Sequence, residues 1–110
     1  MAEGLSGRLY PRRRHSAPCR LTWQERQFLG TTIDVSYSGL ALSLAGEVEL
    51  NDEGEVLIQI PIGIPDAVTL RARPVYIHPQ QGEKKRVGFK LASIEKGEEH
   101  WHTLCYAPPW

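Results

Sequence analysis

Short runs in which apolar side chains alternate with small or polar ones recur along most of this chain. In two clear runs the apolar positions are Leu40, Leu42 and Leu44, and then Val56 and Ile58. Because successive side chains of a β-strand point to opposite faces, this alternation predicts strands that are buried on one side. Glycine, proline and polar clusters separate the runs and indicate turns. The predicted strands are 17–23, 28–35, 40–44, 55–60, 68–78 and 86–91.

Six short strands at regular spacing predict a mainly all-β, antiparallel domain, either a barrel or a sandwich. Closure into a barrel would remove the exposed strand edges. Pro74 lies inside the fifth run and has no backbone N–H to donate, so we expect an edge position or a β-bulge there. The length of 110 residues suits one domain with a single modest core.

The two ends of the chain depart from the strand pattern. Residues 1–15 show no hydrophobic period, and we expect a flexible arm. Near the other end, Ser93 suits a helix cap, and Pro108 would help to stop the helix. The apolar residues at helical spacing, which we expect to pack, are Ile94, Trp101, Leu104 and Cys105. The predicted organisation is an arm at 1–15, a β-barrel at 16–92, and a helix and tail at 93–110.

The charge of the chain is balanced overall but unevenly distributed. There are 13 basic and 13 acidic residues. The basic residues up to position 20 are Arg8, Arg12, Arg13, Arg14 and Arg20, against Glu3 as the single acid there. Arginine presents a planar fork that suits phosphates and guanine edges, so this cluster indicates an anion site. The alternative is a solvated basic arm, or one that contacts nucleic acid nonspecifically. We do not expect a nucleic-acid partner, because the rest of the chain is acidic.

Several classes of protein and of site do not fit the sequence. No apolar run approaches the length of a membrane span, and the N-terminus lacks the pattern of a secretion signal. We therefore expect a cytoplasmic protein, free or at the cytoplasmic face of a membrane complex, without direct membrane insertion. Cys19 and Cys105 form either a disulfide or two buried thiols. His100, His102 and Cys105 match no zinc spacing, so we expect no metal site.

A polar motif, Asp34-x-Ser36-x-x-Gly39, joins the second and third predicted strands. In an extended chain the Asp34 and Ser36 side chains point to the same face and offer a carboxylate and a hydroxyl to one ligand. Gly39 permits an unusual backbone angle or the close approach of a ligand or strand, and keeps the turn compact. The same residues also suit an ordinary turn. Because no catalytic motif accompanies them, we expect no enzyme and no catalytic residues.

In their order along the chain, these features resemble one known family. Arg8-x-x-x-Arg12 precedes the first strand, Asp34-x-Ser36-x-x-Gly39 follows the second, and Arg86-Val-Gly-Phe-Lys-Leu91 is the last strand before a closing helix. This arrangement resembles the PilZ family of cyclic di-GMP receptors from Arg8 onward. The resemblance implies a six-stranded antiparallel β-barrel with a short C-terminal α-helix, and an N-terminal arm that folds over a surface site beside the motif.

The ligand that the resemblance implies, cyclic di-GMP, carries two phosphates and two guanines. Arg8 and Arg12 would suit the O6/N7 edge of guanine or the phosphates, with a further phosphate contact from the next arginine. Asp34 would accept hydrogen bonds from guanine N1–H and N2–H, a donor pair that adenine lacks, and Ser36 would donate to the ligand. The predicted ligand-binding residues are Arg8, Arg12, Arg13, Asp34, Ser36 and Gly39. We expect no cofactor beside this ligand.

The sequence says less about the process that such a receptor regulates than about the ligand that it binds. Binding would order the arm and create a surface for an effector protein or an attached catalytic domain, with motility, biofilm or exopolysaccharide as the regulated process. The family also includes modules of the cellulose synthase catalytic subunit, and residues 102–110 are similar to the segment after the barrel in those synthases. Other members act as nucleotide-independent protein-binding adaptors. Gly7 leaves open whether one or two nucleotides bind.

Overall fold

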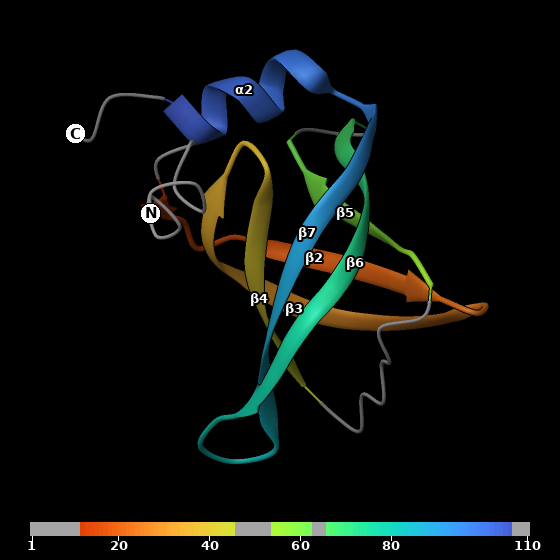
Figure 1. The fold of residues 1–110 in the computed structure, drawn as a ribbon, viewed down its shortest axis with the longest axis vertical. Helices are drawn as coiled ribbons and strands as arrows, with labels where there is room; N and C mark the ends of the chain where they lie inside the picture. The colour runs from red at the N-terminus through yellow and green to blue at the C-terminus, as the bar shows by residue number, and fades with distance from the viewer. Residues whose placement is uncertain (1–11, 46–53, 63–65, 107–110) are drawn as a thin grey trace, which may run out of the picture.

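A computed structural model of the chain describes residues 12–45, 54–62 and 66–106. These residues form seven strands and one helix (Figure 1). The strands are β1 (Arg13–Arg14), β2 (Pro18–Trp23), β3 (Arg26–Ser36), β4 (Gly39–Ala45), β5 (Val56–Pro61), β6 (Ala67–Pro79) and β7 (Lys84–Lys96), and the helix is α2 (Glu98–Tyr106). In the described part of the chain, no helix is long and apolar enough to cross a membrane.

The six longer strands close into an antiparallel barrel, which confirms the predicted fold. They are hydrogen-bonded in the order β3-β2-β5-β6-β7-β4, and β4 pairs again with β3. The two-residue strand β1 joins the same edge of β3 that β2 occupies further along, with Arg13 opposite Val35 and Arg14 opposite Asp34. The chain therefore enters the barrel alongside the end of β3 that carries the Asp34-x-Ser36-x-x-Gly39 motif.

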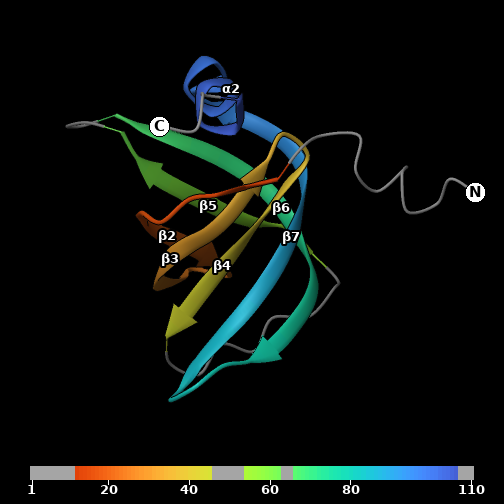
Figure 2. The ribbon, with the colours of Figure 1, turned by 90° about the vertical axis from the view of Figure 1, so that its left-hand side faces the viewer.

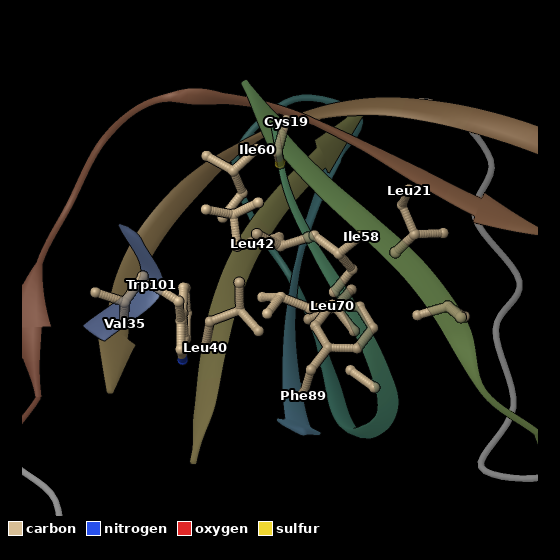
Figure 3. Packing of buried hydrophobic residues seen from close by; sticks show 14 of the residues in the cluster. Cys19, Leu21, Val35, Leu40, Leu42, Ile58, Ile60, Leu70, Phe89 and Trp101 are labelled. Carbon is tan, nitrogen blue, oxygen red and sulfur yellow. The ribbon is translucent and has the colours of Figure 1, made fainter. Parts of the chain in front are cut away.

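The barrel interior holds the alternating apolar positions that the sequence predicted. Leu21, Leu42, Ile58 and Leu70 have no exposed surface, and Phe89 is 3% exposed (Figure 3). Each such side chain stabilises the fold by about 1.5 to 3 kcal/mol relative to full exposure. Helix α2 lies across one end of the barrel, beside the β3–β4 turn (Figures 1 and 2). Its buried face consists of Trp101 and Cys105.

The last strand is longer than predicted, and the predicted start of the helix is wrong. Ser93 and Ile94 lie in β7, where they pair with Arg71 and Leu70 of β6, so Ser93 does not cap a helix. The strand pairing satisfies backbone groups that a helix starting there would have to release. The helix instead follows Gly97, whose φ of 79° suits glycine. Residues 107–110, with the predicted proline stop, lie outside the described residues.

Two further local predictions agree with the structure. The register between β6 and β7 shifts between Pro74 and Tyr76, which is the bulge that a proline inside a strand requires. Cys19 and Cys105 are both buried free thiols. Burial raises the pKa of Cys19 to about 11 and that of Cys105 to about 12, so neither thiol is reactive in the folded state at neutral pH.

Candidate functional site

The motif at the end of β3 divides its side chains between the barrel core and the outer face. Val35 is fully buried in the core. Asp34 and Ser36 alternate with it along the strand and therefore lie on the other side of β3, as the sequence predicted, with Asp34 partly exposed and Ser36 buried at 8% exposure. The Ser36 hydroxyl donates to the carbonyl oxygen of Gly39 at 3.3 Å and closes the β3–β4 turn. In this structure Ser36 thus makes the backbone bond of an ordinary turn, while Asp34 does not.

Gly39 is required here by the close approach of a neighbouring strand. A Cβ atom added at this position would lie 2.5 Å from the carbonyl oxygen of Phe89 in β7. Gly39 is not among the described residues with a positive φ angle, so an unusual backbone angle is not the reason. Of the two roles the sequence allowed for Gly39, the structure shows the close approach.

The Asp34 carboxylate is held on one side only. Arg86 of β7 donates through Nη2 to Oδ2 of Asp34 at 3.0 Å, and through Nε to the hydroxyl of Tyr76 at 3.1 Å. The hydrogen bond to Tyr76, together with the nearby Asp34 charge, raises the pKa of Arg86. The second oxygen of Asp34, Oδ1, is buried and has no hydrogen-bond partner. The oxygen has almost no accessible surface in this structure. Because an unpaired buried acceptor is costly, a ligand donor that reached it would gain free energy.

One buried hydroxyl helps to fasten the segment between β1 and β2 to β3, beside the backbone bonds from His15 N to the Ile33 carbonyl and from Thr32 N to the Ala17 carbonyl. Oγ1 of Thr32 accepts from the backbone N–H of Ala17 at 2.9 Å, donates to the carbonyl oxygen of His15 at 3.0 Å, and lies 2.8 Å from His15 Nδ1. Burial and the charge of Arg13 lower the pKa of His15, so its ring is neutral at pH 7. These bonds hold β1, and the arginines it carries, against the motif strand.

The N-terminal arginines lie in different surroundings. Directly paired residues of neighbouring strands point to the same side, so Arg14, opposite Asp34, faces outward. Arg13, opposite the core residue Val35, faces the helix, and its charge acts on Cys105 of α2. Arg12 precedes β1 and is exposed. Arg8 lies outside the described residues.

The outer face between β1, β3, β4 and β7 carries a groove of about 780 Å³. Three of its lining side chains are cations, whereas one is a carboxylate, so the groove favours an anionic ligand. The lining residues are Arg14, His15, Ser16, Thr31, Thr32, Ile33, Asp34, Ser43, Lys84 and Arg86. Among the described residues, no group of three or more His, Cys, Asp and Glu side chains is placed to hold a metal ion.

Of the predicted ligand-binding residues, Asp34 lines this groove, and Ser36 and Gly39 lie next to it in the β3–β4 turn. Of the cations that line it, Lys84 and Arg86 were not predicted from the sequence, and Arg14 was counted in the arginine cluster but not named as a ligand residue. Arg86 opens the last strand of the motif pattern, but only the pairing of β7 with β4 and of β4 with β3 brings it to Asp34. For Arg14, the alternation along Arg12, Arg13 and Arg14 was a signal that could have been used.

Comparisons with known proteins find a matching family and similar solved structures. A family model described as PilZ domain matches residues 7–107. The structure is similar to that of the Bacillus subtilis inhibitor of motility (MotI/DgrA), with a TM-score of 0.71 and 16% identity over 89% of this chain and 47% of that one. It is also similar to the PilZ domain of YcgR from Escherichia coli with c-di-GMP, with a TM-score of 0.64 and 17% identity over 88% of this chain and 85% of that one. The chain thus spans about half the length of the Bacillus protein. No curated protein sequence matches.

Proposed function

Because the chain belongs to the PilZ domain family, we propose that it is a receptor for cyclic di-GMP. The observation that carries this proposal is the groove beside the family motif, where cations surround a carboxylate whose Oδ1 has no hydrogen-bond partner. The Escherichia coli relative of similar fold was solved with c-di-GMP, which supports the same ligand class here. The proposal concerns recognition and assigns no catalytic step to the chain.

The proposed contacts follow from the chemistry of the ligand. The guanine Watson–Crick edge offers N1–H and N2–H to an acceptor, and Asp34 lines the groove with a carboxylate that suits them. The phosphates and the O6/N7 edges suit arginine forks, which we assign to Arg8 and Arg12 as predicted, with Arg14 as an addition from its place in the groove. Ser36 would contact the ligand by exchanging its bond to Gly39. Arg13 would have to turn away from α2 to reach a phosphate.

We propose that ligand binding is transmitted to an effector protein through the region where β1, the β3–β4 turn that carries the motif, and α2 meet. Trp101 of α2 donates through Nε1 to the carbonyl oxygen of Tyr37 at 3.3 Å, and the Tyr37 hydroxyl donates to Glu98 at 3.1 Å. A ligand that repositions the arm and the motif turn would therefore also alter the surface formed with α2, to which an effector protein would bind. The similarity to an inhibitor of motility favours motility as the regulated process.

Isothermal titration with cyclic di-GMP, GTP and cyclic di-AMP tests the proposal. We expect selective binding of cyclic di-GMP. Arg12→Ala should weaken binding by roughly 10- to 150-fold, which corresponds to the loss of one charge-assisted hydrogen bond. Arg26→Ala is the matched control, because Arg26 is an exposed arginine at the β2–β3 turn that stacks on Phe28 and does not line the groove. Failure of the folded protein to bind cyclic di-GMP would refute the receptor proposal and favour a nucleotide-independent adaptor.

A further inference from the structure

The starting observation is the glycine in the Arg86-Val-Gly-Phe-Lys-Leu91 strand, which the proposed ligand contacts do not explain. Gly88 pairs with Tyr76 of β6 across the bulge that follows Pro74. A Cβ atom added at Gly88 would overlap the aromatic ring of Tyr76. The missing side chain therefore lets the Tyr76 ring lie across β7. His78 packs on this ring with a centroid distance of 4.7 Å and helps to hold it there.

The hydroxyl of the Tyr76 ring accepts a hydrogen bond from Arg86. Arg86 donates from Nε to this hydroxyl and from Nη2 to Asp34 Oδ2, so one planar guanidinium holds both partners at the same time. The two bonds fix the plane of the guanidinium, and a fixed guanidinium in turn fixes the carboxylate it pairs with. The side chains of Arg86 and Asp34 are 32% and 15% exposed, so water competes only in part for this pair.

The pairing leaves Asp34 with one hydrogen-bonded oxygen and one buried oxygen that has no partner. Oδ2 receives Arg86, whereas the buried Oδ1 has no partner. Oδ2 can still accept a second hydrogen bond through its other lone pair. Once the groups that cover Oδ1 move aside for the ligand, a held carboxylate can meet two parallel N–H donors, and that is the pattern that the guanine N1–H and N2–H groups present. Losing the support would leave the carboxylate free to rotate away from that plane.

We propose that Tyr76 and Arg86 are positioning residues that hold the Asp34 carboxylate in the orientation that reads the guanine edge. The proposal rests on the proposed cyclic di-GMP function and adds specificity residues to the same site. Tyr76 acts at a distance from the ligand, through Arg86 and then Asp34. We call the contacts from Tyr76 through Arg86 to Asp34 the relay, and Gly88 supports it by making room for the Tyr76 ring. In a simpler reading, Arg86 only adds positive charge to the groove, and Tyr76 would then have no part in base selection.

The test measures binding of cyclic di-GMP and of cyclic di-IMP, whose hypoxanthine base lacks only the N2 amino group of guanine. Tyr76→Phe keeps the ring and all charges but removes the hydroxyl that holds Arg86. We expect it to weaken cyclic di-GMP binding by about 3- to 10-fold and to reduce the preference over cyclic di-IMP. Lys84→Gln is the charge control: it removes a cation from the groove, so both ligands should bind more weakly with their ratio unchanged.

A double-mutant cycle decides whether Tyr76 acts through Asp34. In an Asp34→Asn background, Tyr76→Phe should have almost no further effect on binding. An equal loss in both backgrounds would overturn the relay, as would wild-type affinity and selectivity in the Tyr76→Phe variant. Both results would leave the receptor proposal intact, provided that the wild type binds cyclic di-GMP.

A measurement on the free protein keeps the relay testable even if no nucleotide binds. In NMR spectra of the wild type, the Nε–H of Arg86 should give a signal protected from solvent exchange, because it is hydrogen-bonded to Tyr76. The signal should lose its protection in Tyr76→Phe. An unprotected Arg86 Nε–H in the wild type would refute the relay, whereas absence of nucleotide binding with the signal present would refute only the proposed function.

Discussion

Removal of the Thr32 hydroxyl should loosen the attachment of residues 13–17 to β3. Thr32 is 2% exposed, and its Oγ1 serves the backbone N–H of Ala17, the carbonyl oxygen of His15 and the His15 ring. Thr32→Val keeps the shape and the β-branching but removes these bonds. The Ala17 N–H and the His15 carbonyl then lose their partner, while the backbone bonds from His15 N to the Ile33 carbonyl oxygen at 3.1 Å and from Thr32 N to the Ala17 carbonyl oxygen at 2.9 Å remain.

The expected cost of Thr32→Val follows from these unpaired groups. Leaving a buried polar group unsatisfied costs about 1 to 3 kcal/mol. Ala17 and His15 are half-buried, so water recovers part of that loss, and we expect about 1.5 to 3 kcal/mol in the free energy of unfolding. With a urea m-value of roughly 1.5 kcal/mol/M for a small domain, the unfolding midpoint should fall by about 1 to 2 M.

Urea unfolding followed by tryptophan fluorescence measures this shift. Thr31→Val is the matched control, because Thr31 is the exposed neighbour on the same strand, and its free energy of unfolding should change by less than about 0.5 kcal/mol. Hydrogen exchange at the His15 amide should quicken in Thr32→Val, because β1 opens more often. Equal midpoints for the two variants would refute the conclusion that this hydroxyl fastens the arm.

Two further predictions concern the turn and the thiols. Gly39→Ala should lower the free energy of unfolding by about 1 to 3 kcal/mol, because the new Cβ would lie 2.5 Å from the Phe89 carbonyl oxygen. Ser38→Ala, at an exposed position of the same turn, is the control. Equal urea midpoints for the two variants would contradict the tight contact. Cys19 and Cys105 should not react with a thiol reagent at pH 8 until urea unfolds the protein, because burial raises their pKa to about 11 and about 12. Rapid labelling of the native protein would contradict their burial. Since folding raises these pKa values above the ordinary 9.0, the folded state retains protons that the unfolded state loses, so stability should fall as the pH rises above 9.

Much of the fold could be predicted because the relevant signal is local. Alternation in Leu40, Leu42 and Leu44 identifies a half-buried strand without knowledge of its partner, and the same holds for the other runs. The prediction failed at Ser93, where helical spacing and cap chemistry also looked adequate. There the pairing of β7 with β6 decided the conformation, and that pairing joins residues more than 20 positions apart.

Part of the candidate site could also be predicted, because its signal is local. The Asp34-x-Ser36-x-x-Gly39 motif is contiguous, so its residue types, its turn and the shared face of Asp34 and Ser36 could be inferred directly. Which arginine faces the groove could not, because that depends on the register that sets Arg14 opposite Asp34 and Arg13 opposite Val35. A register shift of one residue would exchange their faces.

By itself, the sequence determined the strand pattern, the apolar core, the chemistry of the motif and the family to which the chain belongs. These depend on residue type and short spacing, which hold in any arrangement of the strands. Only the tertiary structure decided that Arg86 meets Asp34 from 52 positions away, that Tyr76 reaches Arg86 over Gly88, and that Thr32 fastens the arm. Each of these contacts exists because barrel closure brings distant strands into one register, and no local pattern encodes that register.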